Sequence, residues 1–133
     1  MLSKIDHLGI VVEDLEEGVR VYSQSLGLEV THRETLDDQG VTTVSLGIGE
    51  STLELLSPTR DDSPIAKFLE RNGPGIHHVA YAVPDIEEAL QEACDAGFRL
   101  IDEFPRVGAG GKKIAFIHPK STLGVLSEMV QSI

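Results

Sequence analysis

The chain has 133 residues, of which 41% are hydrophobic, and this is sufficient for one packed domain. Its formal net charge of −11 excludes nucleic acid and anionic membrane surfaces as partners, because both would repel the protein. The single cysteine, Cys94, excludes an internal disulfide and is typical of a reducing compartment. The first residues have neither the apolar run of a signal peptide nor the basic face of a transit peptide, so we expect a cytoplasmic protein.

The first half of the chain is predicted to form a strand, a helix and three further strands. Short β-branched or alternating runs that end at turn residues predict strands at 5–12, 28–35, 41–46 and 51–56. After the first strand, Asp14 is a good N-cap and forms a capping-box pattern with Glu17. The helix is expected to end at Gly27. At helical spacing it should bury Leu15, Val19, Tyr22 and Leu26.

The second half is predicted to repeat this order after a short connecting helix. That helix, at 64–72, has Ser63 as its cap, and the Gly73-Pro74-Gly75 stretch marks the boundary between two modules. Asp85 then caps a helix that Gly97 ends. Its expected buried residues are Ile86, Leu90, Ala93 and Cys94. The expected strands lie at 76–83, 98–102, 112–118 and 124–130.

The two halves are also similar in sequence. Residues 76–90 (IHHVAYAVPDIEEAL) match residues 5–19 (IDHLGIVVEDLEEGV) at an offset of 71, which places His7 on His78 and Asp14 on Asp85. A short chain with such a repeat is built from two copies of one unit. The two histidines therefore occupy equivalent positions in the two copies.

Strand parity places each histidine on a face of small residues. Because side chains alternate across a strand, His7 shares a face with Gly9 and Val11, and His78 shares one with two alanines. The opposite faces are bulky and must pack against helices. This pattern favours a cupped sheet that holds a ligand. A pair of hydrogen-bonded core histidines is the alternative, since structural histidines are common.

Two carboxylates lie at matching places in the last strand of each half. Glu54 follows His7 by 47 residues, and Glu128 follows His78 by 50. A charge amid apolar strands is costly to bury unless it is paired or bound to a metal, and exposed edge-strand glutamates are the alternative. Two imidazoles and two carboxylates suit a divalent metal whose shell is completed by water or substrate oxygens. A closed structural zinc site would more often use cysteines.

Basic residues are concentrated in one segment of this acidic chain. Four of the 11 basic residues lie between Glu103 and Glu128, a stretch without any acid, and these are Arg106, Lys112, Lys113 and Lys120. The segment is either a solvated edge or a positive rim for an anionic ligand. The Gly108–Gly111 run within it lacks the Lys-Ser/Thr pair and the helix of a phosphate loop, and we interpret it as a connection between strands.

The sequence resembles the vicinal oxygen chelate superfamily and, within it, the methylmalonyl-CoA epimerases. The stretch GAGGKKIAFIHPKS at 108–121 carries the resemblance to the epimerases. Further support comes from IDHLGIVV at 5–12, DSPIAKFL at 62–69 and GIHHVAY at 75–81. The similarity covers essentially the whole chain.

The resemblance implies an α+β fold. Two βαβββ modules would form a cupped, partly closed mixed sheet with helices on its outer face. We expect a single domain over residues 1–133. Module one would cover about 4–58, the connecting helix about 63–73 and module two about 75–131. The resemblance also implies a homodimer.

The resemblance further implies a metal-dependent epimerase of propionate metabolism. It would interconvert (2R)- and (2S)-methylmalonyl-CoA by removing and returning the α-proton through a metal-stabilised enolate. The implied ligands of the metal are His7, Glu54, His78 and Glu128, and cobalt is the first choice, with nickel, manganese or zinc as alternatives. Some family members carry a proposed catalytic glutamate where this chain has Thr43, so a mechanism that relies on that glutamate does not transfer.

Glu128 and Glu54 are our candidates for the two acid–base groups that act on the α-carbon. The candidates for binding the phosphates of coenzyme A are Lys112, Lys113 and Lys120, together with Arg106. Flexible lysines bind phosphate as point charges, without a fixed geometry.

Three alternative functions remain open. A glyoxalase I-type lactoylglutathione lyase uses the same kind of metal site and also moves a proton next to a carbonyl. A ring-cleaving dioxygenase would use an iron site of two histidines and one carboxylate, which Glu54 as a fourth ligand disfavours. The fold would also serve as a metal-free module that binds a small molecule.

Overall fold

The computed structural model describes residues 1–132, which form two compact units. The first unit is His7–His77, and the second consists of Met1–Asp6 and the chain from His78 onward. The element order is strand, helix and three strands in each half of the chain, so the predicted α+β class with two βαβββ modules is confirmed. None of the helices in these residues is long and apolar enough to cross a membrane.

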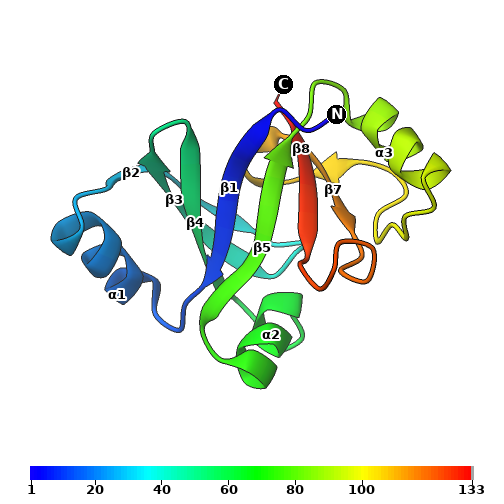
Figure 1. The fold of residues 1–133 in the computed structure, drawn as a ribbon. Coiled ribbons are helices and arrows are strands. Elements are labelled where there is room, and N and C mark those ends of the chain that lie inside the picture. The colour runs from blue at the N-terminus through cyan, green and yellow to red at the C-terminus, as the bar shows by residue number, and fades with distance from the viewer. Residues whose placement is uncertain (133) are drawn as a thin grey trace. The chain divides into compact units, whose positions relative to one another are not determined.

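The first unit has its strands in the order β2-β3-β4-β1 (Figure 1). These strands are β1 (Lys4–Val11, which belongs to this unit from His7 onward), β2 (Glu29–Leu36), β3 (Val41–Ile48) and β4 (Ser51–Pro58). β1 pairs with β4 in parallel, whereas the β2–β3 and β3–β4 pairs are antiparallel. The sheet is therefore mixed, and side chains of paired residues lie on the same face.

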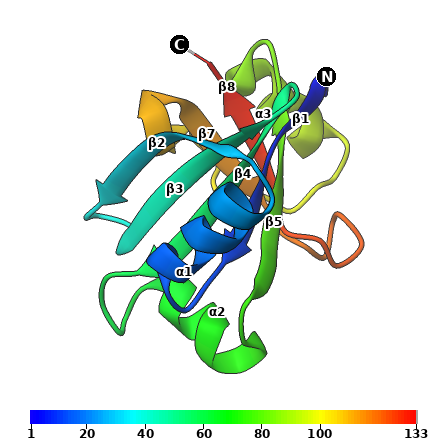
Figure 2. The same ribbon diagram turned by 90° about the vertical axis from the view of Figure 1, so that its left-hand side faces the viewer.

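Helix α1 (Leu15–Val19) covers one face of this sheet, as Figure 2 shows. It begins at Asp14, whose carboxylate accepts the backbone N–H groups of Glu16 and Glu17 at 2.9 and 3.3 Å. Beneath it lies an apolar cluster of Val44, Leu46 and Leu55, with Ile10, Val12, Leu15, Val19, Tyr22, Leu28 and Leu53 packed around it. The bulky face of β1 thus packs against a helix, as predicted.

The helix continues as a π-helical segment, η1 (Arg20–Ser25), which the sequence did not predict. A π-helix has more residues per turn than an α-helix, so the residues after it are rotated relative to the expected helical face. Leu26 is 64% exposed as a result, and the prediction that it is buried is wrong. Gly27 has the positive φ of 83° that favours glycine after a helix end.

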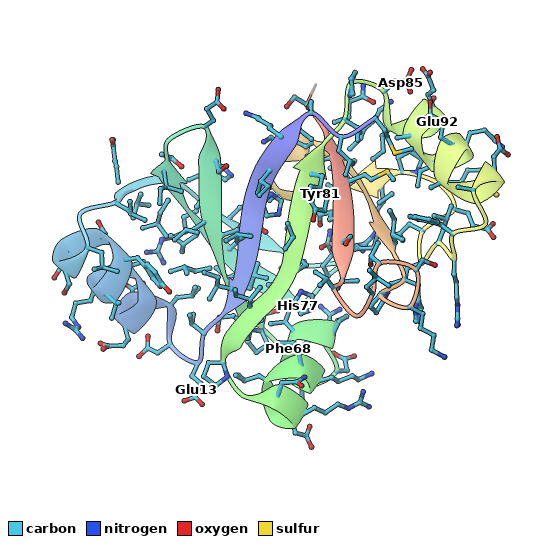
Figure 3. All side chains as sticks on the ribbon, viewed as in Figure 1. Glu13, Phe68, His77, Tyr81, Asp85 and Glu92 are labelled. Carbon is cyan, nitrogen blue, oxygen red and sulfur yellow. The ribbon has the colours of Figure 1, made fainter. Side chains whose placement is uncertain are left out.

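Helix α2 (Pro64–Asn72) packs on the other face of the first unit. It begins as predicted at Ser63, whose buried hydroxyl accepts the N–H groups of Ile65 and Ala66 at 3.1 and 3.2 Å. Its apolar side joins the cluster of Val11, Val41, Leu56 and Ile65, with Leu36, Phe68 and Leu69 at its margin. The rings of Phe68 and His77 meet edge to face at 4.9 Å (Figure 3). The helix thus covers one part of the face that carries His7.

The second unit has the strand order β5-β8-β7-β6. Its strands are β5 (Gly75–Ala82, which belongs to this unit from His78 onward), β6 (Arg106–Val107), β7 (Lys113–Ile117) and β8 (Ser127–Gln131). A short 3-10 helix, η2 (Ala109–Gly111), lies between β6 and β7. β5 and β8 are parallel, like β1 and β4. Helix α3 (Ile86–Asp95) begins at Asp85 and covers one face. The apolar cluster there consists of Val83, Ile86, Ala89, Leu90, Ala93, Ala115, Ile117 and Met129, with Leu100 packed against it.

Two predictions for the second unit are wrong. Residues 98–102 do not form a strand, and only Leu100 makes an isolated bridge, to Ile117. The chain turns away there because the Asp102 carboxylate accepts the Phe116 N–H at 2.8 Å, and the strand at the edge of the sheet is β6 instead. Cys94 is exposed, because it lies one residue beyond Ala93 and therefore about 100° around the helix from the buried face.

Candidate functional site

His7 and Glu54 form a close pair on one face of the first unit. In the parallel register of β1 and β4, Gly9 is opposite Glu54, so His7 lies two residues along the same face. The distance from His7 Nε2 to Glu54 Oε2 is 3.7 Å. Both side chains are largely removed from solvent, with exposures of 8% and 13%. The α2 cluster occupies the adjoining part of this face, since Val11 and Leu56 are the next residues along the two strands.

His78 and Glu128 form an equivalent pair in the second unit. Ala80 is opposite Glu128 in the parallel register of β5 and β8, as Gly9 is opposite Glu54 in the first unit. The distance from His78 Nε2 to Glu128 Oε2 is 3.8 Å, and both side chains are buried. Phe116, the register partner of Glu128, places its ring edge to face with His78 at 5.4 Å between centroids. The sequence repeat is therefore also a repeat of side-chain geometry.

The distances within the two pairs fit ligands of a shared ion better than hydrogen-bonded partners. Both are longer than the 2.7–3.2 Å of an N–H···O hydrogen bond. Two donor atoms that each bind an ion at about 2.1 Å lie roughly 3 to 3.5 Å apart. A movement of a few tenths of an ångström would therefore bring the two donor atoms of each pair to the separation of ligands on a common ion. Neutral imidazole nitrogen and carboxylate oxygen are also donors that such ions accept.

Thr43 adds a hydroxyl to the face that carries His7 and Glu54. On β3, Ser45 is opposite Glu54 and Thr43 is opposite Leu56, so both side chains lie on that face. Thr43 is 1% exposed, and its Oγ1 is buried without a hydrogen-bond partner among the residues that the structure describes. The sequence identified Thr43 as a departure from the family pattern, but nothing in it indicated this buried hydroxyl.

The structure separates the lysines that were predicted to bind phosphate. Lys113 contacts Glu87 on α3 at 3.6 Å, so it points to the face opposite His78 and Glu128. Lys112 contacts Asp6 at 3.6 Å. Lys120 lies in the turn after β7, where its backbone N–H donates to His118 Nδ1 at 3.0 Å.

The positive charges near Lys120 change the pKa of His118. Partial burial, together with the positive charges of Arg99 and Lys120, lowers the pKa of His118 below its ordinary value of 6.5. The neutral ring is also the form that accepts the Lys120 N–H at Nδ1. This turn is therefore a place where an anion would offset nearby positive charge.

Arg106 lies on the same face of the second unit as His78 and Glu128. It is opposite Ile114 on β7, two residues from Phe116, and its guanidinium lies over the Phe116 ring at 5.6 Å. Its Nε contacts Asp102 at 3.3 Å. The sequence placed Arg106 among the basic residues, but its position over Phe116 depends on the two-residue strand β6 that was not predicted.

Comparisons with known proteins agree with this geometry. The sequence model of the Glyoxalase/Bleomycin resistance protein/Dioxygenase superfamily matches residues 6–116. The chain belongs to this superfamily. It is 42% identical to the Bacillus subtilis protein named Uncharacterized protein YqjC, over 98% of this chain and 93% of that protein.

Several relatives with a named activity are epimerases. The chain is 40% identical to the Ethylmalonyl-CoA/methylmalonyl-CoA epimerase of Cereibacter sphaeroides, over 98% of this chain and 99% of that protein. A solved structure of a methylmalonyl-CoA epimerase in complex with methylmalonyl-CoA and NH4+ superposes with a TM-score of 0.96 and 41% identity, over 99% of this chain and 96% of that one. These matches confirm the predicted resemblance to methylmalonyl-CoA epimerases and the prediction that the chain is an enzyme.

Proposed function

We propose that the protein is a metal-dependent epimerase that interconverts (2R)- and (2S)-methylmalonyl-CoA. The observation that carries this proposal is the duplicated histidine–carboxylate pair, held at equivalent positions of the two units at 3.7 and 3.8 Å. The names of the relatives supply the substrate, because two similar proteins are a methylmalonyl-CoA epimerase bound to methylmalonyl-CoA and an ethylmalonyl-CoA/methylmalonyl-CoA epimerase.

In this proposal the two pairs bind one divalent ion. Its protein ligands would be His7, Glu54, His78 and Glu128, and cobalt is the first choice, with nickel, manganese or zinc as alternatives. The donor set supports an ion of this class, because it combines imidazole and carboxylate donors in place of thiolates. A bound divalent ion would act as a Lewis acid toward the oxygens of the substrate and so stabilise negative charge on the deprotonated acyl group.

Glu54 and Glu128 would carry the proton. The α-carbon lies between a thioester and a carboxylate, so inversion requires one base to remove its proton and one acid to deliver a proton to the opposite face. The glutamate that acts as the base starts as a carboxylate and becomes a carboxylic acid as the enolate forms. The other glutamate starts as a carboxylic acid and becomes a carboxylate as it protonates the enolate. Their positions in equivalent strands of the two units give the chain one such group from each copy of the repeat.

Coenzyme A would bind through its phosphates to the basic segment. We propose Lys112 and Lys120 as the contacts, because Lys113 points to the opposite face, toward Glu87 on α3. Lys112 lies 3.6 Å from Asp6, and a phosphate would compete with this carboxylate. Such contacts weaken as salt concentration rises, because exposed charges are screened.

The reaction is tested by hydrogen exchange at the α-carbon. Methylmalonyl-CoA incubated with the metal-loaded protein in deuterated water should incorporate deuterium, and a chelator should stop the exchange until metal is restored. The hemithioacetal of glutathione and methylglyoxal is the parallel substrate. If the protein converts this hemithioacetal and does not incorporate deuterium into methylmalonyl-CoA, it is the lactoylglutathione lyase instead. A protein that holds no metal, shows neither reaction and binds its ligand equally well with a chelator present would indicate the binding module.

A further inference from the structure

Thr43 places a hydroxyl beside apolar residues on the face that carries His7. Its Oγ1 is buried and has no hydrogen-bond partner among the described residues of the chain. Its register partner is Leu56, and Val41 precedes it on the same face, so two sides of it are apolar. Almost all buried polar groups in folded proteins are hydrogen-bonded, and one that is not calls for an explanation.

The hydroxyl is unfavourable for the free protein. Valine has almost the same shape as threonine and would fill the same space without an unsatisfied polar atom. Valine also suits a buried strand at least as well as threonine does. Packing and strand propensity therefore do not account for threonine at this position.

The position of Thr43 relates it to the candidate site. Glu54 and Leu56 are alternate residues of β4 on one face, and Thr43 is opposite Leu56, so it is a diagonal neighbour of Glu54. Such diagonal neighbours lie within reach of a small group bound between them. The opposite neighbours of Thr43, in the α2 cluster, are apolar and carry no group that could bind an oxygen.

We propose that the Thr43 hydroxyl is a hydrogen-bond donor to an oxygen of the acyl group of the bound thioester and so positions the α-carbon at Glu54. The proposal rests on the proposed function for the identity of the acyl group. The acceptor is an oxygen of either the carboxylate or the thioester carbonyl, since each of these oxygens is two bonds from the α-carbon. Binding the ligand then satisfies a hydroxyl that the free protein leaves buried without a partner.

The test compares Thr43→Val and Thr43→Ser with the unaltered protein. Affinities for methylmalonyl-CoA, propionyl-CoA and free coenzyme A are measured by calorimetry, and thermal unfolding is followed without ligand. Thr43→Val should bind methylmalonyl-CoA about tenfold or more weakly, on the scale of a lost hydrogen bond, and bind coenzyme A unchanged. It should unfold at the same or a higher temperature. Thr43→Ser should retain the affinity, because it keeps the hydroxyl.

Propionyl-CoA identifies the acceptor, because it keeps the thioester and lacks the carboxylate. An unchanged affinity of Thr43→Val for propionyl-CoA indicates the carboxylate, and a weakened affinity indicates the thioester carbonyl. Thr42→Val is the matched control. Thr42 lies on the opposite face, where its hydroxyl bonds that of Thr35 at 3.1 Å, and its replacement should leave all three affinities unchanged.

Two outcomes overturn the proposal. One is an affinity of Thr43→Val for methylmalonyl-CoA equal to that of the unaltered protein, and the other is a protein that does not bind methylmalonyl-CoA at all. Deuterium exchange into methylmalonyl-CoA tests the proposed reaction independently of the Thr43 contact. If binding depends on Thr43 but no exchange occurs, the reaction is wrong and the contact stands. If exchange occurs and Thr43→Val binds methylmalonyl-CoA as tightly as the unaltered protein, only the proposed contact of Thr43 is wrong.

Discussion

At the scale of single residues, the proposed chemistry depends on carboxylates held inside apolar strands. Glu128 is 4% exposed and lies next to Met129 and Val130, which belong to the core. Removing one partner of a buried charged pair strongly lowers the stability of the folded protein, because the remaining group loses an interaction that water cannot replace. Conservative substitutions at these positions therefore separate chemistry from folding.

Glu128→Gln tests the acid–base role. Glutamine keeps the size of the side chain and can still contact an ion through its oxygen, but it cannot take up a proton. We expect turnover of methylmalonyl-CoA to fall at least about 10³-fold, on the scale of general acid–base catalysis. Circular dichroism should show an unchanged fold. A loss of less than tenfold would remove Glu128 from proton transfer.

Glu54→Gln shows whether the second carboxylate has the same role. If both glutamates transfer protons, the two variants should lose turnover by comparable factors of about 10²–10⁴. If Glu54→Gln is almost fully active, Glu54 is a metal ligand only and another group supplies the second proton. Steady-state rates measured from both epimers would distinguish these results, since the two directions use the two groups in opposite order.

The sequence was sufficient to predict the His–Glu pairs but not the surroundings of those pairs. The repeat identified His7 with His78, and strand parity placed each with small residues, which the registers at Gly9 and Ala80 confirm. Parity could not show that Thr43 Oγ1 is buried without a partner in the part of the chain that the structure describes, because this depends on which groups surround it. It also could not place Arg106 over Phe116, since that requires knowing where β6 begins.

At the scale of elements, the helices support the site through their caps and their apolar sides. Helix α2 lies over part of the face that carries His7 and contributes Ile65 to the cluster with Val11 and Leu56. Its start is set by Ser63, whose hydroxyl accepts two backbone N–H groups. The Ser63 cap therefore sets where this helix begins, and the apolar cluster packs it on its sheet.

Replacing the cap should lower stability without changing chemistry. Ser63→Ala removes the acceptor for two N–H groups, so we expect the free energy of unfolding to fall by about 1 kcal/mol, within 0.5–2 kcal/mol. Urea denaturation measures the change. Ser25→Ala, at an exposed position of η1, is the control and should change stability by less than about 0.5 kcal/mol. Equal effects of the two substitutions would contradict the role of the cap.

The turn after β7 gives a prediction about pH. The pKa of His118 is lowered by partial burial and by Arg99 and Lys120, so the ring should titrate below 6.5 in nuclear magnetic resonance spectra. If Lys120 binds a phosphate of coenzyme A, the added negative charge should raise the pKa of His118 in the complex. The shift should be smaller in Lys120→Gln. An unchanged His118 titration on addition of coenzyme A would place the phosphates elsewhere.

The differences between predicted and observed elements have local causes. Helix α2 was predicted with its observed bounds because a serine cap and a proline mark its start and glycine its end. The π-helical segment η1 was missed, since a change in helical pitch leaves no signal in a pattern assumed to repeat every 3.6 residues. The strand predicted at 98–102 has suitable residues, but side-chain and backbone bonds to Phe116 compete with the ladder.

At the scale of the whole molecule, the duplication divides the proposed site between two copies. Each unit contributes one imidazole and one carboxylate, at 3.7 Å in the first and 3.8 Å in the second. A site with only two protein ligands would leave most of the coordination of a divalent ion to water, whereas four protein ligands would leave room for the substrate. We therefore expect the two pairs to act as one site.

Metal stoichiometry tests this claim most directly. The amount of cobalt retained per chain after desalting is measured for the unaltered protein and for His7→Ala and His78→Ala, which each alter one pair. We expect one ion per chain and its loss from both variants, because each removes a ligand of the same ion. Two ions per chain, or full retention by either variant, would contradict it.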